Sequence, residues 1–150
     1  MSYQRAVAYL TDPASRLLVF DHVRSADAGT QVPAGGIHAG EAPEAAAMRE
    51  LVEESGISAA RMVRKLGECW WNADGRPVPT GYEEQMHHVF HLHLDAPTAA
   101  AEWEWDERDG DHLSGHRFAF RWIDLAAAET QLFPEQAMWI ALLRLSIIRM

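Results

Sequence analysis

GGIHAGEAPEAAAMRELVEESGI, residues 35–57, is the stretch from which the rest of the chain can be interpreted. Its second half predicts an α-helix. Pro43 suits the first helical position, where a missing N–H group costs nothing. Ala45–Val52 contains good or tolerable helix formers, and Gly56 suits the left-handed residue after a last helical turn. We therefore expect a helix that begins near Pro43 and ends just before Gly56.

One side of this predicted helix is acidic. At about 100° per residue, Glu50, Glu53 and Glu54 fall on the same side. Like charges three or four residues apart destabilise a helix by about 0.2–0.5 kcal/mol per pair, and a bound cation offsets that cost. Carboxylate oxygens converging from one face favour Mg²⁺ or Mn²⁺. The opposite side, expected to face the core, consists of Ala45, Met48, Leu51 and Val52.

Acidic residues on a helix are also typical of an ordinary solvated surface, so the wider spacing carries the argument. Gly35 is followed after five residues by Glu41 and, after seven more, by the run from Arg49 to Ile57, RELVEESGI. A pattern with so many fixed residues rarely arises by chance. It resembles the signature of the Nudix hydrolase family, and every position of that signature is met.

The resemblance implies an enzyme that uses a divalent cation to cut a phosphoanhydride bond in a nucleoside diphosphate linked to another group. It implies that Glu53 and Glu54 are metal ligands, and that Glu50 is a ligand or the base that activates water. The main-chain carbonyl of Ala34 is implied as a further ligand. The resemblance also implies that Arg49 and Glu41 orient this cluster. It implies that Gly35 and Gly56 are needed for the conformation of the backbone.

Composition limits the other classes of function. A chain of 150 residues with 48% hydrophobic content suits one domain, residues 1–150, with a full core. No apolar run is long enough to span a membrane, and a single cysteine, Cys69, excludes an internal disulfide, so we expect a cytoplasmic protein. The net charge of −9 disfavours a broad nucleic-acid surface. A small nucleotide remains compatible, because bound metal ions supply positive charge locally.

Alternating and β-branched segments predict about five strands around the central helix, with a second main helix at the C-terminus. This order predicts an α/β fold, an α/β/α sandwich with a mixed sheet, which is also what the resemblance implies. The expected strands are Tyr3–Leu10, Arg16–Val23, Arg61–Trp71 with a bulge at Gly67, Gln85–Leu94 and Arg117–Ile123.

Two features after this signature, residues 35–57, which we call the box, suggest substrate contacts. Trp70 and Trp71 are adjacent in a predicted strand, so one of them faces away from the core and is a candidate to stack on a ring of the substrate. The alternative is packing in the core or at an interface. They precede a surface loop, 72–84, of a length that is often functional. Its first residues, Asn72 to Gly75, contain neither the tyrosine nor the proline associated with known substrate subgroups, so the substrate stays unidentified.

The predicted strand Gln85–Leu94 has His87, His91 and His93 on one face. They form either a solvated or substrate-facing polar surface, or a second, transition-metal site. Further on, segment 96–115 alternates carboxylates and indoles and is expected to be a loop. The resemblance implies that one of its six acids is an additional ligand or base, and a simple solvated loop is the alternative. Glu102 and Glu104 are candidate substrate contacts.

The last helix is predicted from Pro134 to Met150, with a buried stripe of Met138, Leu142, Leu145 and Ile148. Trp139 and Ile147 widen this stripe, which leaves apolar surface for a homodimer contact. The leading hypothesis is a metal-dependent nucleotide pyrophosphohydrolase. The alternatives are a non-catalytic nucleotide-sensing module and an RNA 5′-end pyrophosphohydrolase.

Overall fold

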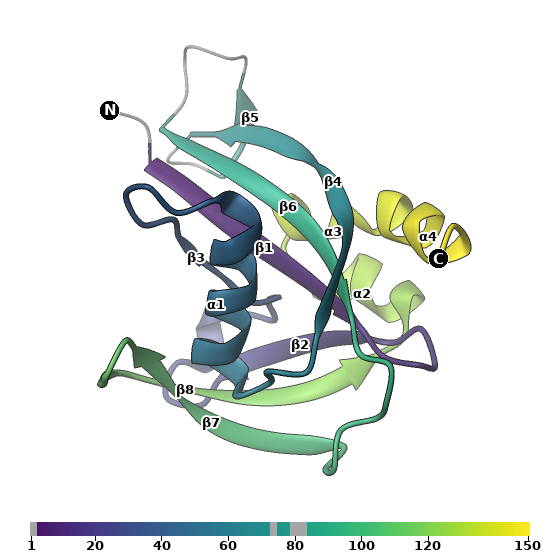
Figure 1. Cartoon of the computed structure of the whole chain (residues 1–150), viewed down its shortest axis with the longest axis horizontal. Helices are drawn as coiled ribbons and strands as arrows, with labels where there is room; N and C mark the ends of the chain where they lie inside the picture. Colours follow the sequence, from purple (N-terminus) through teal and green to yellow (C-terminus); the bar gives the residue numbers. More distant parts are fainter. Residues whose placement is uncertain (1–2, 73–74, 79–83) are drawn as a thin grey trace.

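A computed structural model describes residues 3–72, 75–78 and 84–150 of the chain. At its centre lies one mixed sheet in the strand order β5-β4-β6-β1-β2-β8-β7, with β3 paired beside β1 (Figure 1). β1 and β6 are parallel, and the other neighbouring strands are antiparallel. The strands are β1 (Tyr3–Thr11), β2 (Leu17–His22), β3 (Ala34–Gly36), β4 (Arg61–Trp71), β5 (Pro77–Val78), β6 (Gln85–His93), β7 (Glu102–Asp109) and β8 (His112–Ile123).

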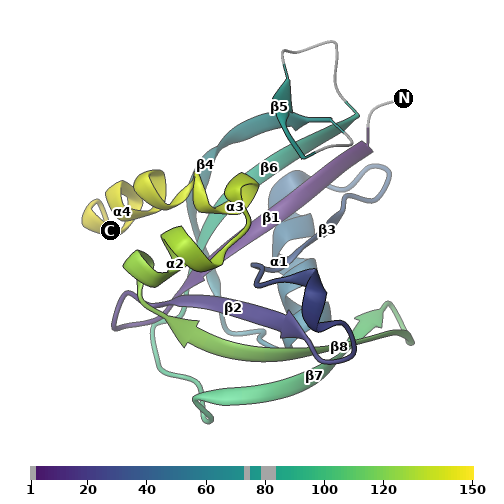
Figure 2. The same ribbon diagram turned by 180° about the vertical axis from the view of Figure 1, so that it is seen from behind.

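Helices cover both faces of the sheet, which confirms the predicted α/β/α sandwich. α1 (Pro43–Ser55) lies on one face, and three shorter helices lie on the other, as Figure 1 and Figure 2 show from opposite sides. Within the described ranges, none of the helices is long and apolar enough to span a bilayer. The remaining helices are a 3₁₀ turn (Ala26–Ala28), α2 (Leu125–Gln131), α3 (Pro134–Ala137) and α4 (Ile140–Ile148).

The two halves of the sheet diverge, and this divergence positions α1. Thr11 pairs with Leu17 at the turn that joins β1 to β2. Away from this turn β1 lies between β6 and β3, whereas β2 pairs with β8. α1 contacts β1 and β3 from one half and β7 from the other. A helix held between two half-sheets has more than one buried side, which matters for its acidic residues.

The five expected strands are confirmed as β1, β2, β4, β6 and β8. The described residues form eight strands, however, so the expected number was too low. β3 and β5 contain three and two residues, too few for alternation to reveal them. β7 lies in the segment expected to be a loop, and it pairs with β8, which starts at His112 rather than Arg117. The bulge predicted at Gly67 is confirmed, since the β4–β6 register shifts between Lys65 and Gly67.

Two of the three histidines on this face of β6 are buried and His87 is half-buried, so the expectation of a solvated surface was wrong for His91 and His93. His91 is fully buried, and His93 is 8% exposed. The two ring nitrogens of His91 lie 2.8 Å from the Thr11 hydroxyl and 2.6 Å from the Ser146 hydroxyl of α4. The same Thr11 hydroxyl lies 2.7 Å from Nδ1 of His93. Hydroxyl groups from β1 and α4 therefore provide the hydrogen-bond partners that water was expected to provide.

The C-terminal segment also differs from its prediction. The helix is interrupted: α3 ends at Ala137 and α4 begins at Ile140. Ile140 and Leu143 are fully buried and Ser146 is 2% exposed, so these positions face the sheet. The predicted buried stripe was wrong, because its members are exposed: Met138 49%, Leu142 42%, Leu145 50% and Ile148 78%.

Candidate metal and active site

α1 begins and ends where the sequence predicted. Pro43 is its first residue, and Gly56 follows its last turn with φ +80° and donates its N–H to the Val52 carbonyl at 2.9 Å. The predicted separation of an apolar core face from an acidic face was wrong. Ala45 and Val52 are exposed, whereas Glu50 and Glu54 are 7% and 3% exposed. Because both half-sheets contact α1, its acidic side is enclosed as well as its apolar side, which is formed by Ala46, Ala47 and Leu51.

Three carboxylates from two elements converge beside α1. One oxygen each from Glu50, Glu54 and Glu107 lies within 4.8 Å of the others. Glu107 belongs to β7, and it joins this group where the sequence prediction had Glu53. Glu54 also accepts a hydrogen bond from the N–H of Ala34 at 3.3 Å. The structure therefore brings two of the three predicted helix ligands together with one acid from the late segment.

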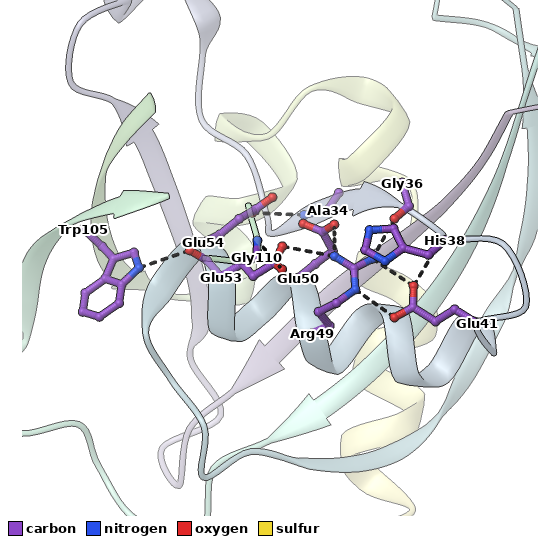
Figure 3. A network of polar contacts seen from close by, with 10 residues as sticks. All are labelled: Ala34, Gly36, His38, Glu41, Arg49, Glu50, Glu53, Glu54, Trp105 and Gly110. Carbon is purple, nitrogen blue, oxygen red and sulfur yellow. Dashed lines mark hydrogen bonds and ion pairs between the residues drawn. The ribbon is translucent and has the colours of Figure 1, made fainter. Parts of the chain in front are cut away.

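Arg49 organises the other acids of the box. Its Nε and Nη2 donate to the two Glu41 oxygens at 2.8 and 2.9 Å. Its Nη1 donates to Glu50 at 2.9 Å and to Glu53 at 3.1 Å, and Nη2 also reaches the Gly36 carbonyl at 2.8 Å. Figure 3 shows these contacts as dashed lines around one guanidinium. The planar fork of an arginine suits such multiple, directed donation.

These contacts and the differing burial of the carboxyl groups give them different pKa values. Hydrogen bonding from Arg49 lowers the pKa of Glu41 to about 2. Burial raises the pKa of Glu50, although Arg49 opposes the shift. Burial, reinforced by the charges of Glu50 and Glu107, raises the pKa of Glu54 well above its ordinary value. Glu54 therefore lies in the environment least favourable to a bare negative charge.

The donor set fits a divalent cation. Among the described residues, no basic side chain lies within ion-pair distance of Glu54. Buried carboxylates that repel one another are stabilised by a positive charge placed between them. Their oxygens are the hard ligands that Mg²⁺ and Mn²⁺ prefer. The residues present therefore suit the ion that the box implies.

A cavity of about 410 Å³ opens beside this cluster. Its floor is the backbone of β3, where Gly35 and Gly36 leave space for the Glu50 carboxylate and for the Tyr3 hydroxyl. Glu53 and Arg49 also face this cavity, and the Glu53 Oε1 accepts the N–H of Gly110 at 3.4 Å. Its lining consists of Tyr3, Ala34–His38, Arg49, Glu50, Glu53, Glu107–Asp109 and Ser114.

The structure of β7 shows which acid of segment 96–115 reaches the carboxylate cluster. Side chains alternate along a strand, so Glu102, Glu104 and Asp106 share one side, as the sequence suggested. On that side Arg117 binds Glu104 at 2.7 Å and Asp106 at 2.9 Å. Glu107 lies on the other side, which faces α1. The alternation in the sequence places Glu107 on the opposite side from Glu104 and Asp106, but it does not show which side of the strand meets the helix.

The predicted substrate contacts lie away from the cavity. Glu102 and Glu104 line a separate hollow of about 430 Å³ between β7 and β8. Trp71 is 3% exposed, and its ring centroid lies 5.7 Å from that of His87. Trp70 is half-buried, and neither tryptophan lines the site cavity. Residues 73–74 and 79–83 of the predicted substrate loop lie outside the described residues.

Comparison with known proteins agrees with this geometry. The family model described as NUDIX domain matches residues 1–143. Nudix hydrolase 25 of Arabidopsis thaliana is 47% identical over 97 residues, a match covering 50% of this chain and 55% of that protein. The aligned part thus spans about half the length of the curated relative.

Two solved structures share the fold. An Ap4A hydrolase binary complex from C. elegans has a TM-score of 0.70 with 17% identity, over 99% of each chain. The E. coli dihydroneopterin triphosphate pyrophosphohydrolase has a TM-score of 0.63 with 20% identity, over 91% of each chain. The two structures show the same fold, and the family model over residues 1–143 shows that the chain belongs to the Nudix hydrolase family.

Proposed function

We propose that this chain is a Mg²⁺- or Mn²⁺-dependent pyrophosphohydrolase that cuts a phosphoanhydride bond in a nucleoside diphosphate derivative, with residues 1–150 as one catalytic domain. The observation that carries the proposal is the convergence of Glu50, Glu54 and Glu107 within 4.8 Å beside a cavity of about 410 Å³. Both structural neighbours are named for polyphosphate substrates, which supports a substrate of this class.

The residues divide into those that hold the ion and those that orient its ligands. Glu54, Glu50 and Glu107 would hold it, joined by Glu53 and the Ala34 carbonyl, which line the same cavity. A bound divalent ion supplies positive charge against the phosphates and makes water a better nucleophile at neutral pH.

Arg49 keeps Glu50 and Glu53 aimed at the cavity while itself held by Glu41 and the Gly36 carbonyl. As an alternative to binding the ion, Glu50 is the candidate general base that activates water, since Arg49 holds its carboxylate at the cavity. Gly35 and Gly56 allow the close backbone approaches around the helix. The single Cys69 supports a cytoplasmic location.

The test is a nucleotide panel assayed with Mg²⁺, with Mn²⁺ and with a chelator, following release of phosphate-containing products. Glu54→Gln and Glu53→Gln are each expected to lower the rate on the order of a thousandfold. Glu129→Gln is the matched control, because Glu129 is a half-exposed acid that binds Arg144 at 3.0 Å outside the cavity. A double variant with undiminished hydrolysis would contradict the proposal.

The same experiment separates the alternatives. Nucleotide binding measured by calorimetry, without turnover under any metal condition, would favour a sensing module. Hydrolysis of 5′-triphosphorylated RNA, with binding that weakens steeply as salt rises, would favour the RNA reaction. The net charge of −9 argues against the latter.

A further inference from the structure

Two tryptophans of β7 bind the last turn of α1. The indole Nε1 of Trp105 donates to the Glu53 carbonyl at 3.1 Å, and that of Trp103 donates to the Ser55 carbonyl at 3.0 Å. The last four carbonyls of a helix have no donor within the helix itself. Gly56 satisfies the Val52 carbonyl. The two indoles therefore satisfy carbonyls that the helix end would otherwise leave to water.

The rings are fixed as closely as their N–H groups. A β-carbon on Gly56 would lie 2.7 Å from the Trp105 ring, so this indole packs directly on the glycine that ends α1. The Trp103 ring stacks on Phe120 of β8, with centroids 5.3 Å apart and planes 15° from parallel. β7 is thus held between the helix end and the neighbouring strand, as the Trp105 contact in Figure 3 illustrates.

This attachment determines where Glu107 lies. In a strand, residues two apart face the same side and are separated by about 6.7 Å. Trp103, Trp105 and Glu107 therefore form one row facing α1, and Glu107 extends that row to the carboxylates of Glu50 and Glu54. A shift of β7 along α1 would move Glu107 away from them.

We propose that Trp103 and Trp105 are positioning residues for the metal-binding carboxylates: their N–H groups set the register of β7 against α1 and so place Glu107 beside Glu50 and Glu54. This inference rests on the proposed function, since it assigns the cluster to a divalent ion. Neither indole touches the cavity; both act through Glu107.

The test compares three tryptophan-to-phenylalanine variants, each of which keeps an aromatic ring and removes one N–H donor. Trp105→Phe and Trp103→Phe remove the contacts to α1. Trp122→Phe is the matched control, since the half-buried Trp122 donates its Nε1 to the Thr98 hydroxyl at 3.1 Å and does not line the cavity. Binding of Mn²⁺ to each protein is measured without substrate, by calorimetry or electron paramagnetic resonance, alongside Tm.

Trp105→Phe is expected to weaken Mn²⁺ binding about tenfold, the usual effect of removing a group that orients a ligand. Trp122→Phe is expected to lower Tm without changing ion affinity. In a Glu107→Gln background, Trp105→Phe is expected to have little further effect on ion affinity, because the two changes act through the same carboxylate.

Unchanged Mn²⁺ affinity in both Trp103→Phe and Trp105→Phe would overturn the inference while leaving the proposed function intact. An equal loss of affinity in the Glu107→Gln background would also overturn it, since the effect would then be general loosening. Wild-type protein that neither binds Mn²⁺ nor hydrolyses any nucleotide would contradict the proposed function itself. If Trp105→Phe does not fold, Trp103→Phe, whose ring keeps Phe120 as a neighbour, decides the question.

Discussion

Gly35 lies directly against the carboxylate of Glu50: a β-carbon on Gly35 would sit 2.0 Å from the Glu50 carboxyl carbon and 2.2 and 2.3 Å from its oxygens. The two residues belong to different elements, β3 and α1, and no side chain fits between them. The glycine that opens the box is therefore needed for a specific close approach, which its sequence position alone does not explain.

Gly35→Ala should displace the Glu50 carboxylate by about an ångström. A displacement of that size in a catalytic group costs on the order of a hundredfold in rate, and we expect that loss in a steady-state assay while circular dichroism stays unchanged. Gly40→Ala is the control: Gly40 has φ +76°, and no atom of the described residues lies within 4 Å of a β-carbon built there, so it should cost only about 1 kcal/mol of stability. Equal rates in the two variants would contradict the contact.

Glu107→Gln should lower the hydrolysis rate and weaken metal binding, whereas Glu104→Gln should do neither. Only Glu107 of this pair faces the Glu50 and Glu54 oxygens, within 4.8 Å, while Glu104 points outward to Arg117. We expect a loss of about a hundredfold for Glu107→Gln, measured as hydrolysis against metal concentration. A larger effect at Glu104 would mean that β7 faces α1 with its other side.

Arg49→Lys should reduce activity about 10- to 100-fold although the charge is kept. A single ammonium cannot hold Glu41 through two parallel bonds and reach Glu50 and the Gly36 carbonyl at the same time. Arg144→Lys serves as the control, because Arg144 binds one exposed acid, Glu129. Full activity of Arg49→Lys would show that charge alone is needed.

His91 predicts how stability changes in mild acid. Burial, with the nearby charges of His93 and Arg64, lowers the pKa of His91 to about 4 from an ordinary value of 6.5. As the pH falls, the unfolded chain therefore binds a proton at His91 before the folded chain does. The free energy of unfolding should fall as pH drops from about 6.5 to about 4, by up to about 3 kcal/mol, and should be unaffected by His91 above that range.

Urea unfolding of His91→Gln across this pH range is the measurement. The variant should lose the part of the pH dependence of the unfolding free energy that His91 causes and keep the rest. This holds even if its stability at neutral pH is lower. His112→Gln, at an exposed position of β8, should retain the wild-type slope. Identical slopes for wild type and His91→Gln would contradict burial of a neutral imidazole.

Two leucines of α4 test the corrected orientation of that helix. Leu143 is fully buried, and Leu142 is 42% exposed. Leu143→Ala should lower the free energy of unfolding by about 2–5 kcal/mol, through lost burial and the cavity left behind. Leu142→Ala should change it by about 0.5 kcal/mol or less. The reverse order in thermal or urea unfolding would restore the stripe that the sequence suggested.

The orientation of α4 was hard to predict because Ile140–Ile148 is apolar almost throughout. Without polar residues at a regular spacing, no periodicity distinguishes the buried side. The burial of His91 was missed for another reason. Its partners Thr11 and Ser146 lie 80 and 55 positions away in the chain, so no local pattern could show that two hydroxyls would satisfy the imidazole.

The sequence by itself determined α1, its ends at Pro43 and Gly56, and the gathering of acids along it, because helix caps and helical spacing are local properties. Tertiary structure decided that Glu107 completes the cluster, that Trp103 and Trp105 hold β7 to the helix end, and that Gly35 must lack a side chain. These depend on which distant segments meet, and contact between β7, β3 and α1 arises only when the two half-sheets close around the helix.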